Sequence, residues 1–100
     1  MSNVLTGNPL VLDTDGATLL STKRLEIVKI RWVSELGSQG DLAIIQDGDG
    51  VTRWKSVCDG ANYVESESWH PDYPFVADGL ILDTLGSGTL YLYLRQKAPV

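Results

Sequence analysis

The chain has 100 residues, 43% of them hydrophobic, and its 13 acidic and 8 basic residues give a net charge of -5. This length is close to the commonest size of a single domain, and it permits one core that buries about two-thirds of the unfolded chain's surface. The negative charge opposes binding to phosphate backbones and so argues against a nucleic-acid partner. A single cysteine, Cys58, cannot form an internal disulfide, so packing and backbone pairing are expected to hold the fold.

We expect no targeting signal in the first residues of this sequence. The first residues lack the basic and apolar segments of a secretory signal, and no stretch approaches the roughly 18 apolar residues needed to cross a membrane. We therefore expect a protein made in the cytoplasm, without a membrane partner. We expect an extended N-terminal arm over residues 1–8, one β-domain over residues 9–95 and a flexible C-terminal tail over residues 96–100.

The first half of the chain consists of short apolar stretches bounded by turn residues. The Asn8-Pro9 pair opens a strand expected at residues 10–12, and residues 13–16 have the composition of a turn. Further strands are expected at residues 17–21 and 25–33, followed by a loop over residues 34–40. In the longer strand, one face is expected to carry Val28, Ile30 and Trp32, and the other Ile27, Lys29, Arg31 and Val33.

A hairpin is expected over residues 42–57. Its arms are separated by Asp47-Gly48-Asp49-Gly50, and Asp-Gly pairs supply the positive φ angles that tight reversals need. The two aspartates are similar to the start of a calcium loop. However, the twelfth position counted from Asp47 is Cys58 rather than the bidentate glutamate that such a loop requires. The segment therefore predicts a hairpin turn and no metal site.

Residues 63–68 are polar and alternating, which is typical of an edge strand. Glu65 and Glu67 are expected on one solvent-facing side of it, where charge discourages unwanted pairing with other edges. In that position they do not flank a substrate as the paired carboxylates of a glycosidase do.

The large aromatic residues fall into two groups. Trp32 and Trp54 lie within strands and are expected mainly in the core. Trp69 and Tyr73 lie in a loop with two prolines, which resists both helix and sheet pairing, and they are expected at the surface. There they would stack on a sugar or anchor a protein interface, or else the loop would fold over an open end of the core.

The C-terminal third ends in the clearest strand of the chain. Residues 75–77 begin one strand, residues 79–82 are apolar, and residues 83–88 have turn chemistry. In residues 89–94 the leucines alternate with Tyr91 and Tyr93, so the leucines are expected in the core and the tyrosines on the opposite face. No window has a helical period. We expect an all-β protein, a single antiparallel β-sandwich or jelly-roll-like barrel of seven to eight short strands.

The chain carries no motif that indicates an enzyme, a cofactor or a metal site. Cys58 and His70 form the sole conventional nucleophile and base, and nothing around Cys58 indicates an activated thiol. We expect a buried cysteine and a loop histidine. There is no phosphate loop, dinucleotide fingerprint or serine elbow, so a protein without catalytic residues and without a cofactor is expected.

Three stretches of the chain carry a resemblance to known proteins, namely Leu5-Thr6-Gly7-Asn8-Pro9-Leu10-Val11-Leu12, Lys29-Ile30-Arg31-Trp32-Val33 and Ser87-Gly88-Thr89-Leu90-Tyr91-Leu92-Tyr93-Leu94. In these stretches the chain resembles small virion proteins of tailed bacteriophages, namely head decoration or cement proteins and related small fibre and tail components. The resemblance implies a structural protein on the capsid surface of the virion that binds the major capsid protein or other virion proteins and stabilises the shell. It also implies a homo-oligomer, with a trimer as the expected form.

The residues expected in contacts with partners come from three places in the chain. They are Leu10, Val11 and Leu12 near the start, Trp69 and Tyr73 in the proline loop, and Tyr91 and Tyr93 in the last strand. Residues 4–12 are expected to join the edge of a neighbouring sheet through main-chain hydrogen bonds. The alternative is a carbohydrate- or receptor-binding β-module of a phage tail or fibre, with Trp69 and Tyr73 as its stacking platform.

Overall fold

The computed structural model describes residues 3–4, 9–15, 17–70 and 73–95, and within residues 17–23 it describes the backbone alone. These residues form seven antiparallel strands and no helix, so the expected all-β class is confirmed. The strands are β1 (Leu10–Leu12), β2 (Ala17–Ser34), β3 (Leu42–Gln46), β4 (Thr52–Val57), β5 (Tyr63–Ser68), β6 (Phe75–Leu85) and β7 (Thr89–Leu94). They form one folded sheet in the order β1-β7-β2-β6-β3-β4, with β5 also paired to β2, and this sheet does not close into a barrel.

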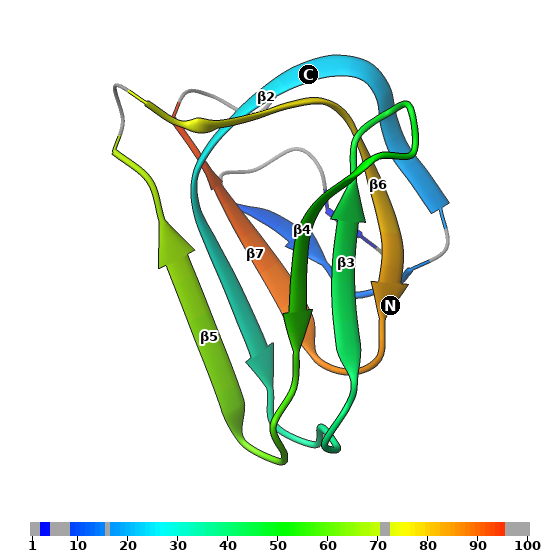
Figure 1. Ribbon diagram of the computed structural model, residues 1–100, viewed down its shortest axis with the longest axis vertical. Coiled ribbons are helices and arrows are strands. Elements are labelled where there is room, and N and C mark those ends of the chain that lie inside the picture. Colours follow the sequence, from blue (N-terminus) through cyan, green and yellow to red (C-terminus); the bar gives the residue numbers. More distant parts are fainter. Residues whose placement is uncertain (1–2, 5–8, 16, 71–72, 96–100) are drawn as a thin grey trace.

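The long strand β2 connects two halves of the sheet. Its C-terminal part pairs with β7 on one side and β5 on the other, whereas its N-terminal part pairs with β6. One half-sheet therefore contains β1, β7, β2 and β5, and the other contains β2, β6, β3 and β4. Figure 1 shows β4 in front of the start of β7, as expected for two layers with a core between them.

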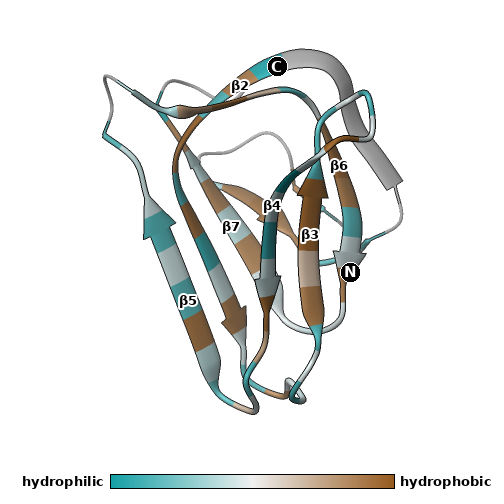
Figure 2. Cartoon of the chain, in the orientation of Figure 1, coloured by the Kyte–Doolittle hydropathy of each residue, from teal (hydrophilic) through white to brown (hydrophobic). Residues whose placement is uncertain are grey.

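The core is filled by leucine, isoleucine and tryptophan from both half-sheets. Trp32 is fully buried and Trp54 is 7% exposed, as predicted, and the leucines of β7 all point inward. Figure 2 shows the resulting alternation of hydropathy along β7. The buried apolar residues are Leu10, Leu12, Leu25, Ile27, Ile30, Trp32, Ala43, Ile45, Trp54, Cys58, Ala77, Leu80, Leu82, Leu90, Leu92 and Leu94.

Two strands are longer than the sequence predicts, because irregular positions do not end them. The expected strands at residues 17–21 and 25–33 are parts of β2, and residues 75–82 continue through Gly79, at φ +90°, to form β6. In β2 a register shift against β7 falls between Ile27 and Lys29. The shift lets Ile27 and Ile30 both face the core, so the prediction that Ile27 shares a face with Lys29 is wrong.

The start of the chain lies along its own sheet. β1 pairs with β7, and Val4 and Val11 exchange backbone hydrogen bonds of 2.8 and 3.0 Å. The side-chain oxygen of Asn3 accepts hydrogen bonds from the backbone amides of Asp13 and Thr14. The prediction that residues 4–12 join a neighbouring sheet is therefore wrong for β1, which completes the sheet of its own chain. The other residues of the expected arm, 1–2 and 5–8, lie outside the described residues, as does the expected tail at 96–100.

Candidate functional site

The side of the β1, β7, β2 and β5 half-sheet that faces away from the core is the candidate site, and we call it the outer face. Its central positions come from paired strands, with Arg31 opposite Tyr91, Lys29 opposite Tyr93 and Val33 opposite Thr89. The two tyrosines are half-buried and Arg31 is exposed. The outer face is made up of Val11, Lys29, Arg31, Val33, Val64, Ser66, Ser68, Thr89, Tyr91 and Tyr93.

One end of the outer face is aromatic and basic. The Lys29 ammonium lies 5.6 Å from the centre of the Tyr93 ring, at a distance that allows a cation–π interaction. Arg31 is the cross-strand neighbour of Tyr91. In a chain with a net charge of -5, this end therefore presents two cations beside two aromatic rings.

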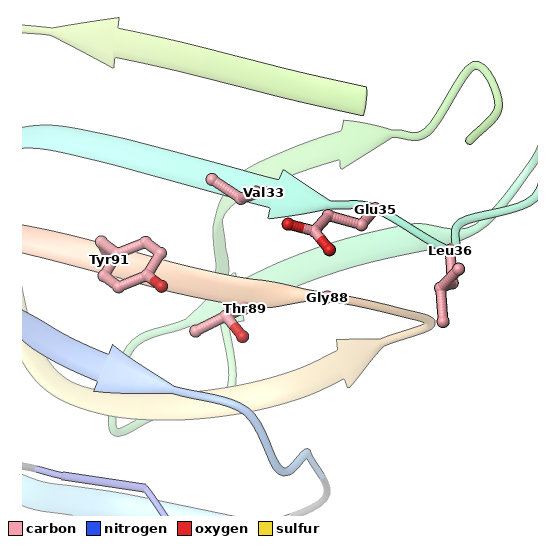
Figure 3. A pocket seen from close by; sticks show the side chains of 6 residues that line it. All are labelled: Val33, Glu35, Leu36, Gly88, Thr89 and Tyr91. Atoms are coloured by element: carbon pink, nitrogen blue, oxygen red, sulfur yellow. The ribbon is translucent and has the colours of Figure 1, made fainter. Parts of the chain in front are cut away.

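The other end of the outer face contains a hollow of about 280 Å³, shown in Figure 3. Leu36 stands at this hollow with 93% of its surface exposed. The hollow therefore combines an acidic group, apolar surface and a tyrosine. The residues that line it are Val33, Glu35, Leu36, Gly88, Thr89 and Tyr91.

The hollow owes its shape to the tight turn between β6 and β7. The Trp32 indole donates a hydrogen bond of 2.9 Å to the Ser87 carbonyl oxygen, and the Ser34 and Ser87 hydroxyls lie 2.6 Å apart. Gly88, at φ +78°, lets this turn pass directly over the end of β2. On the other side, the Glu35 carbonyl oxygen accepts a hydrogen bond of 2.9 Å from the Asn62 amide. The walls of the hollow are therefore held by core residues and by backbone.

The expected contact residues do not all lie on the outer face. Tyr91, Tyr93 and Val11 belong to it, but Leu10 and Leu12 are fully buried in the core of their own chain. The side chains of Leu10 and Leu12 are therefore not accessible to a partner.

Trp69 and Tyr73 do not form one exposed platform. Trp69 is partly buried against the core, with its ring edge-on to Phe75 at 5.0 Å, whereas Tyr73 is 80% exposed and lies beside His70. Because a sugar platform needs an exposed tryptophan face, the placement of Trp69 favours the prediction that this loop covers an open end of the core.

Cys58 and His70 lie at opposite ends of β5. The Cys58 thiol is fully buried and donates a hydrogen bond of 3.0 Å to the Gly60 carbonyl oxygen, before β5 begins. His70 follows the far end of that six-residue strand, which spans about 17 Å. The two side chains therefore cannot act as nucleophile and base in one site.

The expected hairpin of β3 and β4 is confirmed, and its first aspartate has a structural role. One Asp47 carboxylate oxygen accepts hydrogen bonds from the amides of Asp49 and Val51, at 3.0 and 3.1 Å, and the other accepts one of 3.0 Å from Arg53 Nε. The carboxylate is thus occupied by the turn itself. Among the residues that the structure describes, no three histidine, cysteine or acidic side chains are grouped as a metal site would require.

Asp47 is expected to make stability depend on acid pH. The hydrogen bond from the Val51 amide, together with those from Asp49 and Arg53, outweighs the effect of burial and lowers the pKa of Asp47 below its ordinary value of 3.8. Since the folded pKa is depressed, this contribution is complete above pH 3.8 and is lost as the pH falls through the lowered pKa. Urea unfolding of the wild type and Asp47→Asn across acid pH is expected to show a stability difference that shrinks towards low pH. A constant difference would contradict this role.

Glu65 and Glu67 lie on the side of β5 that turns towards the core, and the prediction that both face solvent is wrong for Glu65. Glu65, which is partly buried, accepts a hydrogen bond of 3.2 Å from the Tyr63 hydroxyl, and the exposed Glu67 accepts one of 2.9 Å from the Trp54 indole. The hydrogen bond between Trp54 and Glu67 connects β4 to β5. Burial is the main cause that raises the pKa of Tyr63. Inward-pointing charge protects the β5 edge from further pairing.

The chain matches no family model, no curated protein and no solved structure. Among the described residues there is no helix long and apolar enough to span a membrane.

Several residues of the outer face are absent from the sequence-based set of contacts. Lys29, Arg31 and Val33 alternate along β2 with the same period as the tyrosines, and this pattern is visible in the sequence. What the pattern does not reveal is that β2 pairs with β7, which is 55 or more residues away along the chain. Glu35 and Leu36 lie in a segment that reads only as a loop, and no sequence signal marks them as part of the hollow.

Proposed function

We propose that this chain is a non-enzymatic structural protein of a phage virion, a decoration or cement subunit that binds the outer surface of the capsid and stabilises it. The resemblance of the segments that contain β1, the end of β2 and β7 to such proteins supports the class. The observation that carries the proposal is the outer face, which sets Tyr91 and Tyr93 beside Lys29 and Arg31 on the solvent side of a sheet.

This composition suits a protein interface. Tyrosine and arginine are enriched at the centres of protein interfaces, because each gives a large contact area and a polar group that can still find a partner. The outer face lies on hydrogen-bonded strands backed by the core, so its side chains lose little freedom on binding. A major capsid protein with an acidic or hydrogen-bonding surface is the partner that these residues would fit.

The assembled form that the resemblance implies is a homotrimer on the capsid. Several weak contacts that act together give a much higher effective affinity than one contact, without demanding a large interface from a 100-residue subunit. The trimer is part of the proposal. It predicts three copies of the chain at each occupied symmetry position of the shell, which the stoichiometry of binding measures.

The test is co-sedimentation with purified capsids that lack this protein. Wild type is expected to bind at a saturating, symmetry-related stoichiometry, and Tyr91→Ala with Tyr93→Ala is expected to weaken binding by about thirtyfold, the loss typical of a central interface aromatic. Tyr73→Ala, at a tyrosine that is 80% exposed and off the outer face, is the matched control. Thermal melting checks that each variant is folded. Failure of the wild type to bind, or equal binding by the double variant, would contradict the proposal.

A further inference from the structure

We propose that two copies of this chain pair face to face in solution through the hollow end of the outer face, with Arg31 of each copy against Glu35 of the other. The two-fold axis passes beside Val33. This inference uses the same outer face as the proposed function, so a pair must separate before Arg31 and Tyr91 of one copy can meet a capsid. The pairing itself needs no capsid, so the two proposals can fail independently.

The first support is a strip of three residues, Arg31, Val33 and Glu35, whose two opposite charges have no ion-pair partner among the described residues of their own chain. Arg31 and Val33 lie on the same side at the end of β2, and Glu35 directly follows its last residue, Ser34; Val33 and Glu35 both line the hollow. Arg31 and Glu35 do not form an ion pair with each other. Neither makes an ion pair with any residue that the structure describes, and both are exposed.

The second support is that the strip is complementary to itself. A two-fold axis perpendicular to β2 at Val33 places position 31 of one copy opposite position 35 of the other, and the reverse holds at once. Two identical ion pairs then flank a Val33 to Val33 contact, between sheets packed about 10 Å apart. A partner of uniform charge would satisfy one of the two charges and oppose the other, so a second copy fits this strip better.

The third support is the exposed leucine at the rim. Leu36 follows Glu35 directly, and Arg31 is the cross-strand neighbour of Tyr91. When Glu35 of one copy meets Arg31 of the other, Leu36 comes over the partner's Tyr91 ring, at the hollow. The pairing therefore removes from water an apolar side chain that is 93% exposed in the single chain.

Charge reversal tests the pairing directly, because the double variant restores what each single variant breaks. Arg31→Glu and Glu35→Arg each set like charges against each other in two symmetric places, and each is expected to weaken association by about tenfold or more. The combined Arg31→Glu and Glu35→Arg variant keeps the net charge and is expected to recover wild-type association. Lys55→Glu, at an exposed position of β4, makes the same charge change as Arg31→Glu away from the outer face and is the control.

Analytical ultracentrifugation over a range of concentrations gives the readout. The wild type and Lys55→Glu are expected to reach about twice the 10.9 kDa of one chain, the single reversals to remain monomeric at those concentrations, and the double reversal to return to the dimer. A wild type that is monomeric or trimeric throughout would overturn the pairing, as would a double reversal that stays monomeric. Capsid co-sedimentation of the single reversals then shows separately whether shell binding survives the loss of the dimer.

Discussion

Replacement of Gly88 by alanine is expected to lower the free energy of unfolding by about 3 kcal/mol or more, a large loss for a domain of this size. A Cβ atom at this position would clash with the Val33 carbonyl oxygen and lie 2.7 Å from the Ser34 Cα atom. Both atoms belong to the backbone of β2, which cannot move aside without breaking its pairing with β7. The positive φ of 78° adds strain for any residue with a side chain.

Gly50→Ala is the matched control for this effect. Gly50 has a similar φ of 83°, but a Cβ atom there would meet nothing within 4 Å. Its substitution should therefore cost only the strain of the backbone conformation, about 1 kcal/mol. Urea unfolding followed by circular dichroism measures both variants. Equal losses for the two would show that the close approach of the β6 to β7 turn to β2 does not limit stability.

Replacement of Trp32 by alanine is expected to cost about 3–5 kcal/mol, the range typical of a fully buried large aromatic side chain. Trp32 is 0% exposed and its ring meets the Tyr63 ring edge-on at 5.5 Å. Its indole also donates the hydrogen bond to the Ser87 carbonyl oxygen that fixes the turn beside the hollow. The substitution therefore leaves a cavity and releases the wall of the candidate site at the same time.

Two further substitutions separate these contributions. Trp32→Phe keeps most of the apolar volume but removes the indole donor, and it is expected to cost about 1–3 kcal/mol, part of it from the Ser87 carbonyl oxygen that is left without that donor. Trp69→Ala removes a tryptophan that is only partly buried and is expected to cost less than Trp32→Ala. Chemical unfolding followed by circular dichroism provides the measurement, and a loss at Trp69 as large as that at Trp32 would contradict the assignment of Trp32 to the centre of the core.

Local patterns in the sequence predict most of the strands. The leucine and tyrosine alternation of β7 and the two Asp-Gly pairs between β3 and β4 depend on neighbours within a few residues, and both features are present as expected. The single strand β2 is not predictable in the same way. The bend that carries it from one half-sheet to the other depends on pairing with β5, β6 and β7, which lie far away along the chain.

The candidate site is predictable only in part, for the same reason. Tyr91 and Tyr93 are visible as the outward positions of a regular strand. The association of Arg31 with Tyr91 depends on strand order, and Leu36 lies in a loop where no sequence signal marks its exposure. The sequence does not decide where Leu10 and Leu12 lie. An apolar segment at this position fits a free arm that binds a partner, and it fits a short strand in the core equally well.

The proposed function depends most on the outer face being the surface that meets a partner. Hydroxyl-radical footprinting of the free protein at concentrations where it is monomeric, and of the protein bound to capsids, measures this directly, since tyrosine and leucine side chains are modified according to their exposure. The proposed function predicts that Tyr91, Tyr93 and Leu36 become protected on binding, while Tyr73, which is 80% exposed and lies off the outer face, stays reactive. Protection of Tyr73 with Tyr91, Tyr93 and Leu36 unchanged would contradict it.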